Sequence, residues 1–184
     1  QFADGVYEVC AVHNTRLIDE DAHLDRLERS LAELGISTPM SRAAMKIVLR
    51  ETLARNRIRN GIVYMQVTRG VASRDHNYPA GLKPVLVVTA RHTNPARRAS
   101  VLRDGISVVT VPDQRWARCD IKSISLLPNV LARQTAKDKG VQEAWQVASD
   151  GLVTEGAATN ACIVDSAGIL RTSPANGGIL NGIV

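Results

Sequence analysis

Aromatic residues and long apolar runs are scarce in this sequence. Aromatic side chains make up 3% of the 184 residues, so we expect an aliphatic core. Charged residues interrupt every apolar run before it reaches the roughly 18 residues of a membrane-spanning helix, so we predict no membrane partner. The 45% hydrophobic and 22% charged fractions are ordinary for a globular protein, which excludes a wholly disordered chain, a collagen and a coiled coil.

The sequence also lacks the spacing of common metal and nucleotide sites. Cys10, Cys119 and Cys162 form no CxxC pair, and the four histidines show no HxxxH spacing. Walker A and GxGxxG motifs are missing as well, so a zinc hydrolase, a P-loop NTPase and a Rossmann dehydrogenase are unsupported. Three separated thiols predict a reducing compartment, the cytoplasm.

The net charge of +5 is not concentrated in one segment. Acidic and basic residues alternate along the chain, so we predict no nucleic-acid partner. A non-catalytic basic module that binds an anionic partner stays open as an alternative from charge alone.

Hydrophobic periodicity predicts a mixed chain. Leu24, Leu27, Leu31 and Leu34 share one helix face that ends at Gly35. The predicted helices cover residues 19–34, 41–56 and 126–139, and the predicted strands cover 6–13, 61–69, 83–91, 105–112, 143–149, 152–155, 158–165 and 169–172. Because strands and helices do not strictly alternate, we predict an α+β fold rather than a doubly wound sheet.

Two domains are predicted, with a linker at residues 93–99. The stretch 93–98 breaks the strand pattern and is interpreted as a solvated basic loop. Residues 1–92 would form a small N-terminal α/β domain and residues 100–184 the start of a larger one. The chain opens without an initiator Met directly into a strand pattern and stops at an apolar, uncapped end, so we expect a fragment of a longer protein.

Three sequence elements point to chemistry. Lys122 lies between apolar neighbours, and is either a lysine that reaches solvent at a strand end or a desolvated lysine that forms a Schiff base. Glu155 ends a predicted strand and precedes small residues that admit a flat ligand. Residues 176–183 read as a glycine-rich turn that opens a helix and offers backbone N–H groups to phosphate. A lysine, a carboxylate and a phosphate cradle are the parts of a pyridoxal phosphate enzyme.

Several stretches carry a family resemblance and run in the family's order. They are Asp4–Glu8, His23–Leu27, Thr68–Gly70, Ser73–His76, Arg115–Ser123, Leu126–Leu127, Val153–Gly156 with Asn160, and Ser173–Leu180. The chain resembles the fold-type IV pyridoxal-phosphate aminotransferases, and within them the D-amino-acid transaminases. The resemblance implies a two-domain architecture whose larger, strand-rich C-terminal domain binds the cofactor and is incomplete here.

The resemblance also implies how pyridoxal 5'-phosphate is bound. Lys122 would form the Schiff base and move the proton between the substrate α-carbon and the cofactor. Glu155 would keep the pyridine nitrogen protonated, so that the ring accepts electrons. The remaining contacts would be the phosphate-binding Arg26, the backbone of Ile183 and Val184 at the phosphate, and Leu180 against the ring. Val184 departs from the family's usual Thr. Without the resemblance, Arg26 would be interpreted as a solvated helix residue.

The substrate side follows from the same resemblance. Tyr7, Arg74 and His76 would trap the substrate α-carboxylate, so that a D-amino acid points its α-hydrogen at Lys122. The implied reaction is ping-pong transamination between D-amino acids and 2-oxo acids, of the D-alanine or D-glutamate type. The resemblance also implies a homodimer, and leaves open which subunit's site Arg74 and His76 serve.

Other activities of the same fold remain alternatives. They are a branched-chain L-amino-acid aminotransferase, an aminodeoxychorismate lyase and an R-selective amine transaminase. The Arg74–His76 pair argues against the first two. An inactive fragment that keeps the lysine without holding the cofactor is a further alternative.

Overall fold

The computed structural model describes residues 2–183, which divide into two compact units. The first unit runs to Pro95 and also includes residues 122–125 and 183. The second unit comprises residues 96–121 and 126–182. Within the described residues, no helix has both the length and the apolar character needed to cross a bilayer.

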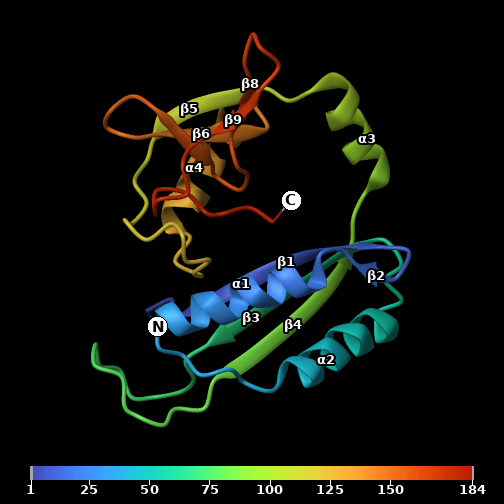
Figure 1. Cartoon of the computed structure of the whole chain (residues 1–184), viewed down its shortest axis with the longest axis vertical. Helices are drawn as coiled ribbons and strands as arrows, with labels where there is room; N and C mark the ends of the chain where they lie inside the picture. Colours follow the sequence, from blue (N-terminus) through green and yellow to red (C-terminus); the bar gives the residue numbers. More distant parts are fainter. Residues whose placement is uncertain (1, 184) are drawn as a thin grey trace. The chain divides into compact units, whose positions relative to one another are not determined.

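The first unit is a four-stranded antiparallel sheet with two helices (Figure 1). Its elements are β1 (Gly5–His13), β2 (Arg16–Leu17), α1 (Glu20–Glu33), α2 (Arg42–Arg55), β3 (Gly61–Thr68) and β4 (Val85–His92). The strand order is β2-β1-β3-β4. Burial alternates along β1 and β3, and the register pairs inward residues such as Val6 with Val67 and Cys10 with Val63. One face of the sheet is therefore buried, as period-2 alternation requires.

Local signals explain the helices of this unit. The leucines of α1 point into the core, where Leu24, Leu27 and Leu31 are at most 2% exposed. The turn after α1 places Gly35 in the left-handed region at φ +60°, a conformation that glycine adopts without strain. The Ser41 side chain accepts a hydrogen bond from the Ala44 amide at 3.3 Å and begins α2. These features confirm the predicted helices.

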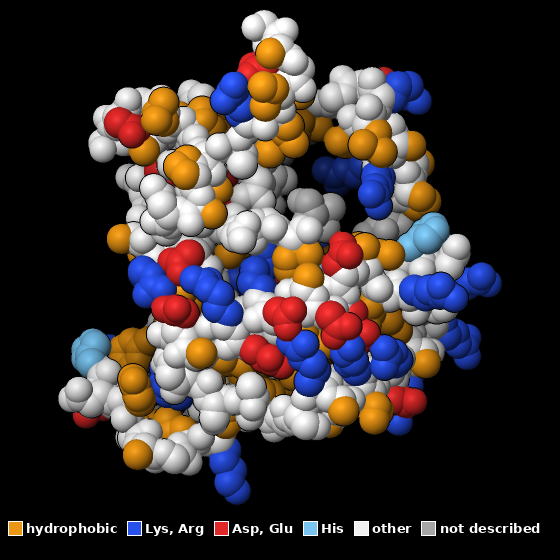
Figure 2. Space-filling view, viewed as in Figure 1, with side chains coloured by type: hydrophobic (Ala, Val, Ile, Leu, Met, Phe, Trp, Pro, Cys, Tyr) orange, Lys and Arg blue, Asp and Glu red, His pale blue; other side chains and the backbone are white. Residues whose placement is uncertain are grey.

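Charged side chains of both signs cover α1 and α2. Figure 2 shows acidic and basic groups side by side over these helices, and Arg42–Glu28, Lys46–Asp21 and Arg50–Glu20 form ion pairs. The alternation seen in the sequence therefore becomes pairing across the surface. Such exposed pairs each contribute little to stability.

The second unit contains α3 (Pro95–Asp104), β5 (Val108–Pro112), α4 (Leu127–Asp138), β6 (Glu143–Val147), β7 (Val153–Gly156), β8 (Cys162–Val164) and β9 (Leu170–Thr172). Strands β5 and β6 are parallel and are joined through α4, while β7 pairs antiparallel with β6. Strands β8 and β9 form a separate hairpin. The mixture of parallel and antiparallel strands confirms the predicted α+β fold.

Two local predictions were wrong. Residues 95–98 of the basic stretch interpreted as a loop form the first turn of α3, because Pro95 occupies the first helical position, where its missing N–H costs nothing. The glycine-rich turn at residues 176–183 is present, but no helix begins within it up to residue 183. Its backbone N–H groups are therefore not arranged as a helix N-terminus in this segment.

Candidate functional site

Lys122 is held against the first strand by backbone hydrogen bonds. The Tyr7 amide donates to the Lys122 carbonyl at 2.9 Å, and the Ile124 amide donates to the Gly5 carbonyl at 3.0 Å. Ser123 forms a β-bridge with Val6 between these bonds. Residues 122–124 thus extend the sheet along β1, although they lie more than a hundred positions away in sequence.

The Lys122 side chain lies over an aromatic ring. Its Nζ is 4.5 Å from the centroid of the Tyr7 ring, and the residue is half-buried. The Tyr7 ring in turn stacks on that of Tyr64, with 5.5 Å between centroids. The structure therefore brings together two of the predicted residues, the lysine and the tyrosine. A cation over a ring face is a favourable arrangement that fixes the amine in place.

A buried carboxylate lies on the opposite face of β1. Glu8 is fully buried, and its two oxygens accept hydrogen bonds from Arg26 Nε at 2.6 Å and Nη2 at 2.8 Å. His23 Nδ1 lies 2.8 Å from the same carboxylate. Burial by itself raises the pKa of Glu8, but the bonds from Arg26 and His23 outweigh it and hold that pKa below the ordinary value.

This cluster changes the interpretation of Arg26. Its side chain is 11% exposed, so the alternative of a solvated helix residue was wrong. His23 and Arg26 lie three positions apart on α1 and so share the face toward the sheet. Sequence reasoning missed Glu8, although its place in the alternating strand already put a charged residue at an inward position.

Arg74 and His76 meet on one aromatic residue. The Arg74 guanidinium carbon is 5.1 Å from the centroid of the Phe2 ring, and the His76 ring centroid is 5.1 Å from the same ring. Both residues are exposed and lie in the loop of residues 70–82. The structure thus places the two predicted substrate residues together. Phe2, which the sequence analysis did not single out, supports both.

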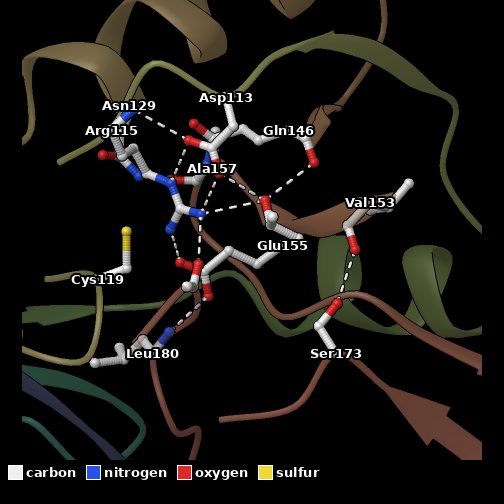
Figure 3. Close-up of polar contacts among 12 residues, drawn as sticks. Asp113, Arg115, Cys119, Asn129, Gln146, Val153, Glu155, Ala157, Ser173 and Leu180 are labelled. Atoms are coloured by element: carbon white, nitrogen blue, oxygen red, sulfur yellow. Dashed lines mark hydrogen bonds and ion pairs between the residues drawn. The ribbon is translucent and has the colours of Figure 1, made fainter. Parts of the chain in front are cut away.

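The second unit holds Glu155 at the end of β7. Its carboxylate accepts hydrogen bonds from Arg115 Nη1 and from the Leu180 backbone amide at 3.1 Å (Figure 3). It also accepts one from Asn160 Nδ2 at 3.2 Å. Glu155 is 7% exposed. A carboxylate fixed by three donors is an oriented acceptor for a further cationic N–H group.

Arg115 connects this carboxylate to a second one. Its side chain is 6% exposed and pairs with Asp113, with Nη2 to Oδ2 at 2.6 Å, while Nη2 also donates to the Gly178 carbonyl at 3.1 Å. Burial raises the pKa of Asp113, but hydrogen bonds from Arg115 and Thr154 outweigh it and keep that pKa below the ordinary value. Sequence reasoning missed both Asp113 and Arg115 as functional candidates.

Of the predicted cofactor-binding residues near the end of the chain, the structure describes Leu180 and Ile183. Leu180 is half-buried, and its carbonyl accepts a hydrogen bond from Asn160 Nδ2 at 2.9 Å. Ile183 is half-buried in the first unit. Val184 lies outside the described residues, so its predicted backbone contact stays a prediction.

The sequence is similar to known proteins over almost its whole length. The model of the family described as amino-transferase class IV matches residues 5–184. The D-alanine aminotransferase of Bacillus licheniformis is 44% identical over 184 residues, which are 100% of this chain and 63% of that relative. The D-alanine aminotransferase of Staphylococcus haemolyticus is 40% identical over 99% of this chain and 64% of its own length.

A solved structure shares the fold over the whole chain. The branched-chain amino acid aminotransferase of Escherichia coli has a TM-score of 0.86 at 20% identity, and the match covers 100% of this chain and 63% of that chain. At this identity the likeness shows the fold alone. The chain spans slightly less than two thirds of the length of the curated relatives it matches.

Proposed function

The chain belongs to the class IV amino-transferases, and we propose that it supports pyridoxal-phosphate-dependent transamination between D-amino acids and 2-oxo acids. Relatives named D-alanine aminotransferase, 44% and 40% identical, support this substrate class. The single observation that carries the proposal is the placement of Lys122, whose amine lies over the Tyr7 ring at 4.5 Å.

The residues present fit the cofactor by their chemistry. The primary amine of Lys122 suits the cofactor aldehyde, and the oriented, buried carboxylate of Glu155 suits the ring nitrogen. The buried guanidinium of Arg26 suits the phosphate. Pyridoxal phosphate would supply an electron sink for the carbanion formed at the substrate α-carbon. Lys122 would hold the aldehyde, and Glu155 would hold a proton at the ring nitrogen.

Lys122 is also the group that moves the substrate proton. Its backbone is fixed to β1 on both sides, which limits the positions that its amine can reach. An amine restrained in this way can take the proton from the substrate α-carbon on one face only. This restraint supports selection of a single enantiomer.

Arg26 is proposed to bind the phosphate group. Its guanidinium is aimed by Glu8, which occupies Nε and Nη2. Arginine presents five N–H donors in a planar fork, a geometry that suits the oxygens of a phosphate group. In this role Glu8 and His23 fix the orientation of Arg26 and do not contact the substrate.

Arg74, His76 and Tyr7 are proposed to bind the substrate α-carboxylate. Arg74 and His76 both rest on Phe2, so the loop presents two cationic or hydrogen-bonding groups at one place. We also propose a cytoplasmic homodimer as the working form. The free thiols of Cys10, Cys119 and Cys162 support the reducing compartment.

The visible absorption spectrum with pyridoxal phosphate tests the proposed function. Purified protein is mixed with the cofactor, and D-alanine or L-leucine is then added in parallel. We expect a cofactor band that D-alanine alone bleaches. A band that responds only to L-leucine would instead indicate a branched-chain enzyme, and a protein that forms no band would refute cofactor binding by this chain.

A further inference from the structure

Glu155 is surrounded by hydrogen-bond donors in the second unit. The donors on its carboxylate include the neutral Asn160 and Leu180 and the charged Arg115. A lone guanidinium beside Glu155 would neutralise that carboxylate. It would then repel a protonated ring nitrogen that approaches the same carboxylate.

Asp113 offsets the positive charge of the Arg115 guanidinium. It binds the far side of the Arg115 guanidinium through two contacts, Nε to Oδ1 at 2.9 Å and Nη2 to Oδ2 at 2.6 Å (Figure 3). The Thr154 hydroxyl donates to the same aspartate at 2.7 Å. These three side chains, one cation between two carboxylates, together carry a net charge of −1, which favours a cationic ring nitrogen beside Glu155.

The same arginine ties a loop to the carboxylate. Arg115 Nη2 donates to the Gly178 carbonyl at 3.1 Å, and the Leu180 amide donates to Glu155 Oε2 at 3.1 Å. Two bonds therefore join residues 178–180 to the Arg115–Glu155 pair. Leu180 is the residue proposed to pack against the cofactor ring, so its position depends on this pair.

We propose that Asp113 and Arg115 are positioning residues: Asp113 offsets the positive charge of Arg115 beside Glu155, and the planar fork of Arg115 orients Glu155 and holds residues 178–180 in place. The inference rests on the proposed function, because it assigns these residues a task toward the ring nitrogen that Glu155 would bind. Neither residue contacts the reacting atoms.

A second arginine–glutamate pair in the same unit provides the comparison. Arg133 Nη1 lies 3.1 Å from Oε1 of Glu143, which is 3% exposed. Glu143 also accepts bonds from the Ala144 amide at 2.8 Å and the Thr159 hydroxyl at 3.2 Å. This pair has the same chemistry, and the contacts just described involve neither Glu155 nor Leu180. Arg133→Met is therefore the matched control.

The experiment measures the protonation of the ring nitrogen directly. Wild-type protein, Asp113→Asn, Arg115→Lys and Arg133→Met are loaded with pyridoxal phosphate that carries ¹⁵N in the ring, and the nitrogen chemical shift is followed against pH. Cofactor affinity is measured in parallel by titration. Borohydride reduction followed by peptide mass analysis first establishes that the wild-type protein carries the cofactor on Lys122.

Asp113→Asn should weaken proton binding at the ring nitrogen by about tenfold, because it removes one neighbouring negative charge and keeps the side-chain shape. Arg115→Lys keeps the charge but loses the planar fork, so cofactor affinity should fall by about tenfold while the nitrogen stays protonated. Arg133→Met should leave both readouts at the wild-type values.

The outcomes separate the two proposals. Wild-type protein without cofactor on Lys122 would overturn the proposed function and this inference with it. Cofactor on Lys122 together with an unchanged nitrogen signal in Asp113→Asn would overturn the charge role alone. If Arg115→Lys binds the cofactor as tightly as the wild type, or if Arg133→Met weakens binding equally, Arg115 has only a structural role.

Discussion

Arg26 holds both carboxylate oxygens of Glu8, at 2.6 and 2.8 Å, inside the first unit. The pair joins α1 to β1 and fixes the direction of a guanidinium that we propose binds phosphate. A buried pair of this kind is costly to break from one side, because the charge that remains has no partner. Stability and cofactor binding are therefore expected to depend on the same contact.

Glu8→Gln should destabilise the protein by about 3 kcal/mol, since it leaves the Arg26 charge buried without its counter-charge. The free energy of unfolding is measured in denaturant at neutral pH. Glu51→Gln is the control, because Glu51 is 58% exposed and forms a surface pair with Arg55, so its loss should be below about 1 kcal/mol. Equal effects of the two substitutions would contradict the burial argument.

The same pair predicts a pH dependence. The folded-state pKa of Glu8 lies below its ordinary value of 4.5, mainly because the hydrogen bonds from Arg26 and His23 outweigh the effect of burial. The carboxylate therefore stabilises the fold fully above about that pH, and this stabilisation is lost as the pH falls through the folded-state pKa. Unfolding free energies between pH 3 and 7 should fall less steeply in Glu8→Gln than in the wild type.

Lys122→Ala should abolish turnover and the covalent attachment of pyridoxal phosphate, because it removes the amine that lies over the Tyr7 ring. Borohydride reduction and intact-mass measurement detect the attachment. Lys139→Ala, at an exposed position after α4, should behave as the wild type. Retained turnover in Lys122→Ala would refute the Schiff-base role.

Glu155→Gln should slow abstraction of the α-proton by tenfold or more, while the cofactor stays attached to Lys122. The amide keeps the bond from Leu180 but no longer stabilises a protonated ring nitrogen. Rapid mixing with D-alanine gives the rate of the first half-reaction. An unchanged rate would contradict the role of Glu155 in the electron sink.

Arg74→Ala should raise the KM for D-amino acids by about tenfold or more and leave cofactor affinity unchanged, because a charge-assisted bond to the substrate carboxylate is lost. Steady-state kinetics and a cofactor titration measure the two quantities. Arg98→Ala, in exposed α3, is the control. An equal loss of cofactor and substrate binding would give Arg74 a structural role instead.

Much of the fold follows from local patterns. The leucine spacing of α1, the Ser41 cap and the alternation of β1 each carry their own physical signal, and the structure confirms them. The helix at residues 95–104 escaped prediction because none of its residues is buried, so it has no amphipathic signal to read. The family is confirmed by the match over residues 5–184.

Only the site residues that belong to sequence motifs could be predicted. Lys122 and Glu155 were singled out from residue type and neighbours, with their roles taken from the family resemblance. The partners of the predicted residues come from other elements: Arg115 pairs with Glu155 across 40 positions, and Glu8 pairs with Arg26 across 18. Such pairings arise when strands and helices pack, so single-sequence periodicity does not contain them.

The most direct test of the central claim is the chirality of the product. The protein is incubated with pyridoxal phosphate, D-alanine and 2-oxoglutarate, and chiral chromatography measures the glutamate formed alongside pyruvate. The account predicts D-glutamate and pyruvate in equal amounts, and no product from L-alanine or L-leucine. Glutamate of the L form, or turnover of L-leucine alone, would contradict it.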